Sequence, residues 1–174
     1  MAREVLFRVC YGSSDVSDNP FKAKLAASLS INDAILHNYC RHKVERADYP
    51  GIIPEKGHSV RGTYVTGLTE HDIQRLDWFE GSEYRRRKVT VALLKPDTQN
   101  SLVEGGEVQT ETYVFTAGAH RLEKEEWDYE VFRREKLHRW ADHSEEYDGK
   151  VSFLGFCGHM LTWSRGRRSG RKWS

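Results

Sequence analysis

Apolar and polar residues alternate at the start of the chain. Four large apolar residues occupy every second position from Val5 to Tyr11, which is the period of a strand that buries one face. A turn of small residues follows, and a proline at Pro20 is typical of the first turn of a helix. The pattern predicts a strand over residues 5–11 and a short helix over about residues 20–29.

The rest of the chain up to about residue 142 divides into further short elements in the same way. Strands are more numerous than helices, which favours an α+β (mixed α/β) domain with a curved sheet. A rigid loop is expected at 49–54, a turn at 56–58 and a polar loop at 97–107. The expected strands cover about 35–44, 59–67, 89–96 and 108–116, and the expected helices run from Thr69 to a stop at Gly81 and over about 123–142.

The predicted helix that starts at Thr69 carries a carboxylate on its apolar face. At about 100° per residue, Glu80 lies between Ile73 and Leu76. Burial and the negative end of the helix would both raise its pKa, and such a group can exchange a proton near neutral pH. A structural role, in which Glu80 bonds backbone amides or a following arginine, is left equally open. Asp77 also faces inward, and for it we expect a structural role.

Composition excludes several classes of protein. The 174 residues suit one core. With 27 basic and 26 acidic residues and 38% hydrophobic residues, the chain is neither a charged tail nor disordered. The apolar runs are too short to cross a bilayer, the first residues are charged where a signal peptide is apolar, and three cysteines do not suggest a disulfide framework. We expect a cytoplasmic protein that does not bind membranes.

Residues 165–174 carry five basic residues and no acidic one. This segment is rich in Gly, Ser and Arg and lacks periodicity, so we expect a mobile tail. Nucleic-acid binding through the tail is conceivable, but a solvated terminus is the favoured interpretation. The predicted organisation is one domain over residues 1–150 and a C-terminal extension over 151–174.

Two weaker groups of residues also carry possible chemistry. The basic run 85–88 begins a strand, where one face could bind a substrate carboxylate, although a solvated edge is favoured. Cys40-x-His42 and Cys157-x-His159 would together offer four zinc-type ligands. No standard spacing supports such a site, so we predict no metal.

Six short motifs follow one another in a fixed order. The Leu-Asp-x-x-Glu-Gly-x-x-Tyr block is the most specific of them. Together they resemble the gamma-glutamylcyclotransferase-like family, in particular its plant and fungal avirulence-induced branch, over about residues 5–141. The motifs are Tyr11-Gly12-Ser13, Tyr49-Pro50-Gly51-Ile52, Val60-Arg61-Gly62, Gly67-Leu68-Thr69, the block from Leu76 to Arg85, and Trp127-Asp128-Tyr129-Glu130.

The resemblance implies a small mixed β-barrel flanked by helices and an acyl-transferring enzyme. In the family's cyclotransferases, the free α-amine of the substrate attacks its own γ-glutamyl carbonyl, which releases 5-oxoproline and an amine or amino acid. No metal or organic cofactor is implied. Glu80 matches the Glu-Gly position and would be the proton acceptor. The matching turn would hold the glutamyl group through backbone amides, and its residues are Tyr11, Gly12, Ser13, Ser14, Asp15 and Val16.

Pattern alone supports that turn only weakly, because many strand–helix turns can aim N–H groups at an anionic or carbonyl oxygen. Ser14 also departs from the Leu or Asn usual in the family. Other functions stay open. The chain could remove a γ-glutamyl group from a biosynthetic intermediate or a γ-glutamylamine, or be a non-catalytic protein of the same fold that binds ligands or nucleic acid. The sequence indicates neither the substrate nor the oligomeric state.

Overall fold

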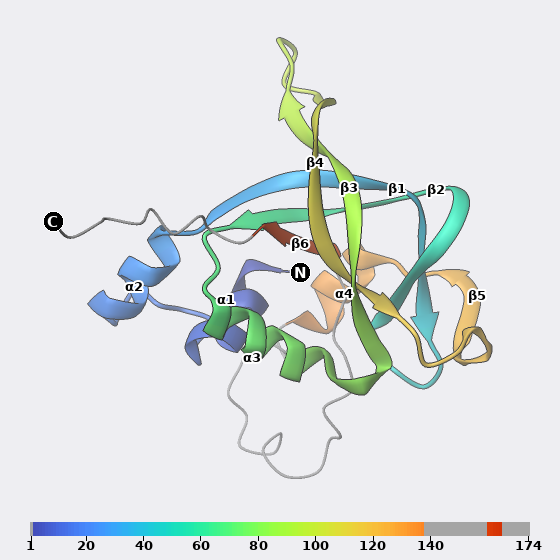
Figure 1. Cartoon of the computed structure of the whole chain (residues 1–174), viewed down its shortest axis with the longest axis horizontal. Coiled ribbons are helices and arrows are strands. Elements are labelled where there is room, and N and C mark those ends of the chain that lie inside the picture. The colour runs from blue at the N-terminus through green and yellow to red at the C-terminus, as the bar shows by residue number, and fades with distance from the viewer. Residues whose placement is uncertain (1, 138–159, 165–174) are drawn as a thin grey trace, which may run out of the picture.

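The computed structural model describes residues 2–137 and 160–164 (Figure 1). Helices and strands are interspersed, as expected for a mixed α+β domain. The helices of the described residues are α1 (Arg3–Tyr11), α2 (Pro20–Ala27), α3 (Glu70–Glu80) and α4 (Tyr129–Glu135), with short 3-10 turns at Gly81–Glu83 and Ala119–Arg121. The strands are β1 (Ser30–Val44), β2 (Pro50–Thr66), β3 (Tyr84–Pro96), β4 (Leu102–Phe115), β5 (Leu122–Glu126) and β6 (Met160–Ser164).

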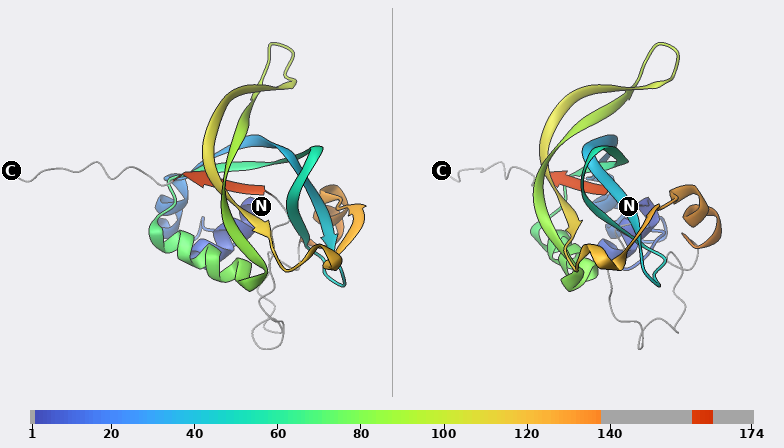
Figure 2. Two further views of the ribbon diagram at one scale, coloured as in Figure 1. Left: turned by 45° about the vertical axis from the view of Figure 1, so that its right-hand side comes forward. Right: turned by 90° about the vertical axis from the view of Figure 1, so that its right-hand side faces the viewer.

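The strands form one mixed sheet in the order β2-β6-β4-β3-β1-β5, and β2 also pairs with β1. The β2–β6 pair is parallel and the other pairs are antiparallel. Because β2 returns to β1, the sheet curls into a barrel-like arrangement. Helices α1 and α3 pack together on one side of it, and the tip of the β3–β4 hairpin projects on the opposite side (Figures 1 and 2). This confirms the expected fold class.

The long antiparallel pair of β1 and β2 contains a wide bulge. The register runs from Ser30 opposite Thr66 to His37 opposite Ser59, and then resumes at Tyr39 opposite Pro54. Residues 55–58 therefore stand opposite Asn38 alone. The predicted turn at 56–58 falls in this bulge, where Gly57 adopts a φ of +89° that favours glycine.

The prediction of a rigid loop at 49–54 is largely wrong. Residues 50–54 of β2 pair with residues 39–43 of β1, so this part of the chain extends the sheet. The prolines at both ends of this stretch suggested a loop, but they lie where a strand tolerates the missing N–H donor. The predicted loop at 97–107 is also shorter, because β4 begins at Leu102.

The predicted strand over 5–11 is wrong, because these residues form helix α1. Leu6 and Cys10 are buried together with Val5, Phe7 and Tyr11, and pairs four positions apart share a helix face. The rings of Phe7 and Tyr11 lie 5.8 Å apart, and the Arg3 guanidinium lies 5.0 Å from the centre of the Phe7 ring. Because most residues of this segment are apolar, it fits both the two-residue period of a strand and the 3.6-residue period of a helix. The alternation therefore did not distinguish a strand from a helix.

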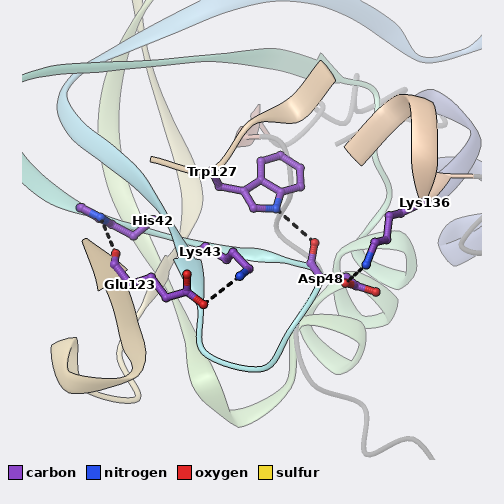
Figure 3. Close-up of polar contacts among 6 residues, drawn as sticks. All are labelled: His42, Lys43, Asp48, Glu123, Trp127 and Lys136. Carbon is purple, nitrogen blue, oxygen red and sulfur yellow. Dashed lines mark hydrogen bonds and ion pairs between the residues drawn. The ribbon is translucent and has the colours of Figure 1, made fainter. Parts of the chain in front are cut away.

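The predicted helix over 123–142 is also wrong in its first part. Residues up to Glu126 belong to β5, and the helix begins only after Asp128, whose side chain accepts hydrogen bonds from the backbone N–H groups of Glu130 and Val131. The Trp127 indole donates to the carbonyl of Asp48 at 3.2 Å, and Lys136 pairs with the Asp48 carboxylate (Figure 3). These contacts fix the turn between β5 and α4. Residues beyond 137 in the predicted helix lie outside the described residues.

Residues 151–174, predicted as an extension, contribute strand β6, which no pattern in the sequence indicated. The backbone of Gly62 is in register with Met160, and that of Thr66 with Ser164. The basic tail 165–174 lies outside the described residues, and the domain division stays a prediction. In the part of the chain that the structure describes, every helix is too short or too polar to span a membrane.

Candidate active site

Helix α3 positions Glu80 as its sequence predicts. Thr69 accepts a hydrogen bond from the Asp72 backbone N–H, and the Asp72 carboxylate accepts one from the Thr69 backbone N–H at 2.9 Å, which completes a capping box. The helix ends at Gly81, whose φ is +67°. Ile73, Leu76 and Glu80 are all buried on one face, so the predicted placement of Glu80 on the apolar side is confirmed.

The Glu80 carboxyl group is completely enclosed. The residue has 0% of its surface exposed, and neither carboxyl oxygen has a hydrogen-bond partner among the described residues. Burial raises its pKa well above the ordinary 4.5, and the nearby charge of Asp77 raises the pKa further. A carboxyl group with a raised pKa can take up and return a proton at a higher pH than an ordinary glutamate, which is the property of a general base.

Asp77, one turn earlier on α3, is bound to the sheet. The Tyr113 hydroxyl donates to Asp77 Oδ1 at 2.8 Å, and Arg86 Nε lies 3.0 Å from the same oxygen. The side chain of Asp77 is partly exposed. Through its two partners on the sheet Asp77 joins α3 to β3 and β4, which is the structural role expected for it. Sequence reasoning missed Tyr113, which is buried and whose pKa is raised by burial, by Asp77 and by the charge of Glu80. Its position on an inward face of β4 could not be linked to α3 from local pattern.

The residues that follow Glu80 connect two of the sequence motifs. Glu83 is buried, forms an ion pair with Arg121, and accepts a hydrogen bond from the Tyr49 hydroxyl at 3.2 Å. The Tyr84 hydroxyl donates to the carbonyl of Pro50 at 3.1 Å. The Glu-Gly-x-x-Tyr block and the Tyr-Pro-Gly motif are therefore packed against each other, and they hold the end of α3 in place.

The turn predicted to bind substrate follows helix α1. Gly12 ends that helix with a φ of +74°, which favours glycine. The Ser13 hydroxyl donates to the carbonyl of Asp15, whose carboxylate accepts the Ser17 N–H at 2.8 Å. That hydrogen bond lowers the pKa of Asp15. The turn thus satisfies part of its own hydrogen-bonding capacity.

The structure does not join this turn to Glu80. Arg75, in the middle of α3, donates to the carbonyl of Cys10 at 2.9 Å. Burial and then the nearby charge of Asp72 raise the pKa of Tyr11. The end of α1 therefore lies against the first half of α3. Asp72 and Glu80 are about 12 Å apart along the helix axis at 1.5 Å per residue. The role of Tyr11–Val16 in binding stays a prediction.

The basic run at the start of β3 is mostly solvated. Arg85, Arg87 and Lys88 are exposed. Arg86 is the exception, because it pairs with Asp77 and lies 3.5 Å from Glu111. The run is thus solvated except at Arg86, which forms two ion pairs.

Comparison with known proteins places these motifs in a family. Residues 9–129 match the family described as "Gamma-glutamyl cyclotransferase, AIG2-like". The matched region includes Glu80 and the Glu-Gly-x-x-Tyr block. The chain belongs to this gamma-glutamyl cyclotransferase, AIG2-like family.

Relatives in the family come from Arabidopsis thaliana. Protein AIG2 C is 32% identical over 100 residues, which cover 58% of this chain and 56% of that protein. Protein AIG2 B is 32% identical over 114 residues, which cover 66% and 63%. The chain thus matches less than two thirds of the length of these relatives. A solution structure from the same plant has a TM-score of 0.44 at 27% identity, covering 68% of this chain and 73% of that one.

Glu80 should make the stability of this family member depend on pH. The folded chain keeps the carboxyl proton to a higher pH than the unfolded chain, whose pKa is near the ordinary 4.5. Between these two pKa values the folded state binds more protons, so the free energy of unfolding falls as pH rises, by up to about 1.4 kcal/mol per pH unit. Glu80→Gln removes this dependence. Urea unfolding should therefore show the variant gaining stability over the wild type as the pH rises above the ordinary pKa of 4.5, and a constant difference between the two proteins would contradict the raised pKa.

Proposed function

We propose that the protein is a gamma-glutamylcyclotransferase that acts in the cytoplasm on a small γ-glutamyl compound, with Glu80 as the general base. One observation carries the proposal. The Glu-Gly position of a chain in this family holds a completely buried carboxyl group, without a hydrogen-bond partner among the described residues and with a raised pKa. General bases that work near neutral pH have this property.

In the proposed reaction, the Glu80 carboxylate removes a proton from the α-ammonium group of the substrate. The freed amine attacks the γ-carbonyl carbon and forms the lactam C–N bond. The original C–N bond then breaks and the leaving nitrogen takes up the proton that Glu80 holds. The attacking nitrogen gives up its second proton through Glu80 to the departing amine, which leaves as an ammonium ion. The products are 5-oxoproline and the amine or amino acid, and no water is consumed. Because the attack is intramolecular, holding the substrate in a folded conformation accounts for much of the expected acceleration.

The substrate ammonium would also supply hydrogen-bond donors to the Glu80 carboxyl group. Its N–H groups would bond the two carboxyl oxygens that lack partners among the described residues. The side chain is enclosed, so the substrate has to displace part of its cover. We further propose that the turn Tyr11–Val16 holds the glutamyl group through backbone N–H groups, which requires this turn to approach the end of α3.

The test is a panel of substrates. The full chain is incubated with γ-glutamyl amino acids, γ-glutamylamines and glutathione, and 5-oxoproline is measured by mass spectrometry. We expect release from at least one class, and the reactive class identifies the leaving group that the enzyme accepts. Binding of several members without release from any would instead support a non-catalytic protein of this fold.

A further inference from the structure

Five side chains with metal-binding atoms meet on β1, β2 and β5, whereas Glu80 lies on α3. Cys40 and His42 are two residues apart on β1, so they point to the same side. Glu126 on β5 is directly opposite His42 in the register. Glu55 and His58 come from the bulge of β2. Three strands thus contribute a thiol, two imidazoles and two carboxylates to one place.

The ligand atoms of this cluster are close together. One atom each from Cys40, His42 and Glu55 lie within 4.8 Å of one another, and the same holds for Cys40, His58 and Glu126. Glu55 connects the two groups, because one of its oxygens lies 2.7 Å from His42 Nε2 and the other lies 3.3 Å from His58 Nε2. The buried Cys40 belongs to both groups.

A hydrogen-bonding partner at Nδ1 fixes the orientation of the His42 ring, as it does in zinc-binding histidines. Its Nδ1 lies 3.1 Å from the carbonyl oxygen of Glu123 (Figure 3), and an acceptor there requires the N–H to be at Nδ1. The Glu123 side chain is itself held by Lys43 at 2.8 Å. Nε2 then faces the Glu55 carboxylate at 2.7 Å, so the imidazole and the carboxylate are placed to bind one metal ion together.

We propose that this cluster binds a divalent cation of the Zn²⁺ type through Cys40, His42, His58 and Glu55, with Glu126 beside them. A thiolate, imidazoles and a carboxylate form a donor set that zinc favours. The negative charges of the thiolate and one carboxylate balance the charge of the ion, which suits a partly buried site. This site is separate from Glu80 and does not depend on the proposed function.

The spacing requires a small adjustment. Zinc–ligand bonds of about 2.0–2.3 Å in a tetrahedron put the ligand atoms about 3.3–3.8 Å apart. Within each of the two groups the ligand atoms lie within 4.8 Å of one another, so they would close by up to about 1.5 Å on binding. Glu55 and His58 lie in the bulge, outside the paired register of β1 and β2, so a shift of this size leaves the register on either side unchanged.

The experiment uses the full chain, stripped of metal with a chelator. Zn²⁺ binding is measured by equilibrium dialysis, and Co²⁺ is then added as a spectroscopic probe. We expect one equivalent of metal, a cobalt–thiolate charge-transfer band and the strong visible bands of tetrahedral cobalt. Cys40→Ser should abolish the thiolate band. The surface variant His58→Gln should weaken binding by at least about tenfold, which is what the loss of an outer-shell partner alone can cost.

Two matched variants serve as controls. His37→Gln removes a histidine of the same strand that also contacts a carboxylate, Glu104, at 3.0 Å, but that lies in neither cysteine group. Cys10→Ala removes a different buried cysteine. Both should keep wild-type affinity and spectra. The absence of a thiolate band, a band that survives in Cys40→Ser, or equal weakening by His37→Gln and His58→Gln would overturn the proposal and leave the cluster as an ion-pair network alone.

Discussion

Replacing Glu80 with Gln should lower the turnover number by on the order of 10²–10⁴, the usual contribution of a general base. The amide keeps the shape of the side chain, but it cannot accept the proton of the substrate ammonium. KM should change much less than kcat, because the lost interaction acts on the reacting proton. The variant should be at least as stable as the wild type at neutral pH, since a buried carboxylate costs more desolvation than an amide.

Asp77→Asn is the matched control on the same helix. It removes a charge that pairs with Arg86 and weakens the acceptor of the Tyr113 hydroxyl. We expect a loss of stability of about 1 kcal/mol and a much smaller effect on turnover than that of Glu80→Gln. Steady-state kinetics and urea unfolding of both variants separate the two roles. A near-normal rate in Glu80→Gln would remove Glu80 as the base.

Replacing Arg121 with Met should destabilise the fold more than Asp77→Asn does. Its partner Glu83 has a side chain only 6% exposed, whereas that of Arg121 is 35% exposed. Without Arg121, Glu83 keeps the Tyr49 hydroxyl as its bonded partner, which cannot neutralise a buried charge. Breaking a fully buried pair costs about 3–5 kcal/mol, and because Arg121 is partly solvated we expect about 2–4 kcal/mol.

Urea denaturation gives this loss directly, and a double-mutant cycle assigns it to the pair. Glu83→Gln should cost less than Arg121→Met, because no charge is then left buried without its partner. The double variant should recover part of the loss seen in Arg121→Met. If Arg121→Met costs less than about 1 kcal/mol, the value typical of a surface pair, the ion pair does not hold the end of α3.

Local signals in the sequence predicted the part of the site that lies on one helix. Thr69 and Asp72 form the capping box, Gly81 ends α3, and the helical period by itself put Glu80 between Ile73 and Leu76. Each of these features depends on residues within one or two turns. The approach of Tyr113 to Asp77, 36 residues apart in the sequence, depends on how β4 lies across α3, which local pattern does not determine.

Errors arose where one pattern fits two structures. Residues 5–11 are apolar at alternate positions, but Leu6 and Cys10 also complete a helical face. The buried residues of α1 include members of both patterns.

The bulge opposite Asn38 brings Glu55 and His58 close to Cys40, a proximity that the sequence did not indicate. Only Cys40 and His42 could be placed together from their spacing. Cys157 and His159, with which they were grouped, lie outside the described residues.

The most direct test of the proposed chemistry is the fate of oxygen during turnover. The wild-type protein is incubated with a reactive γ-glutamyl compound in water enriched in heavy oxygen, and the products are analysed by mass spectrometry. Intramolecular attack by the α-amine predicts unlabelled 5-oxoproline and one equivalent of the released amine. Glutamate that carries heavy oxygen in its γ-carboxyl group would show attack by water, and would contradict cyclisation.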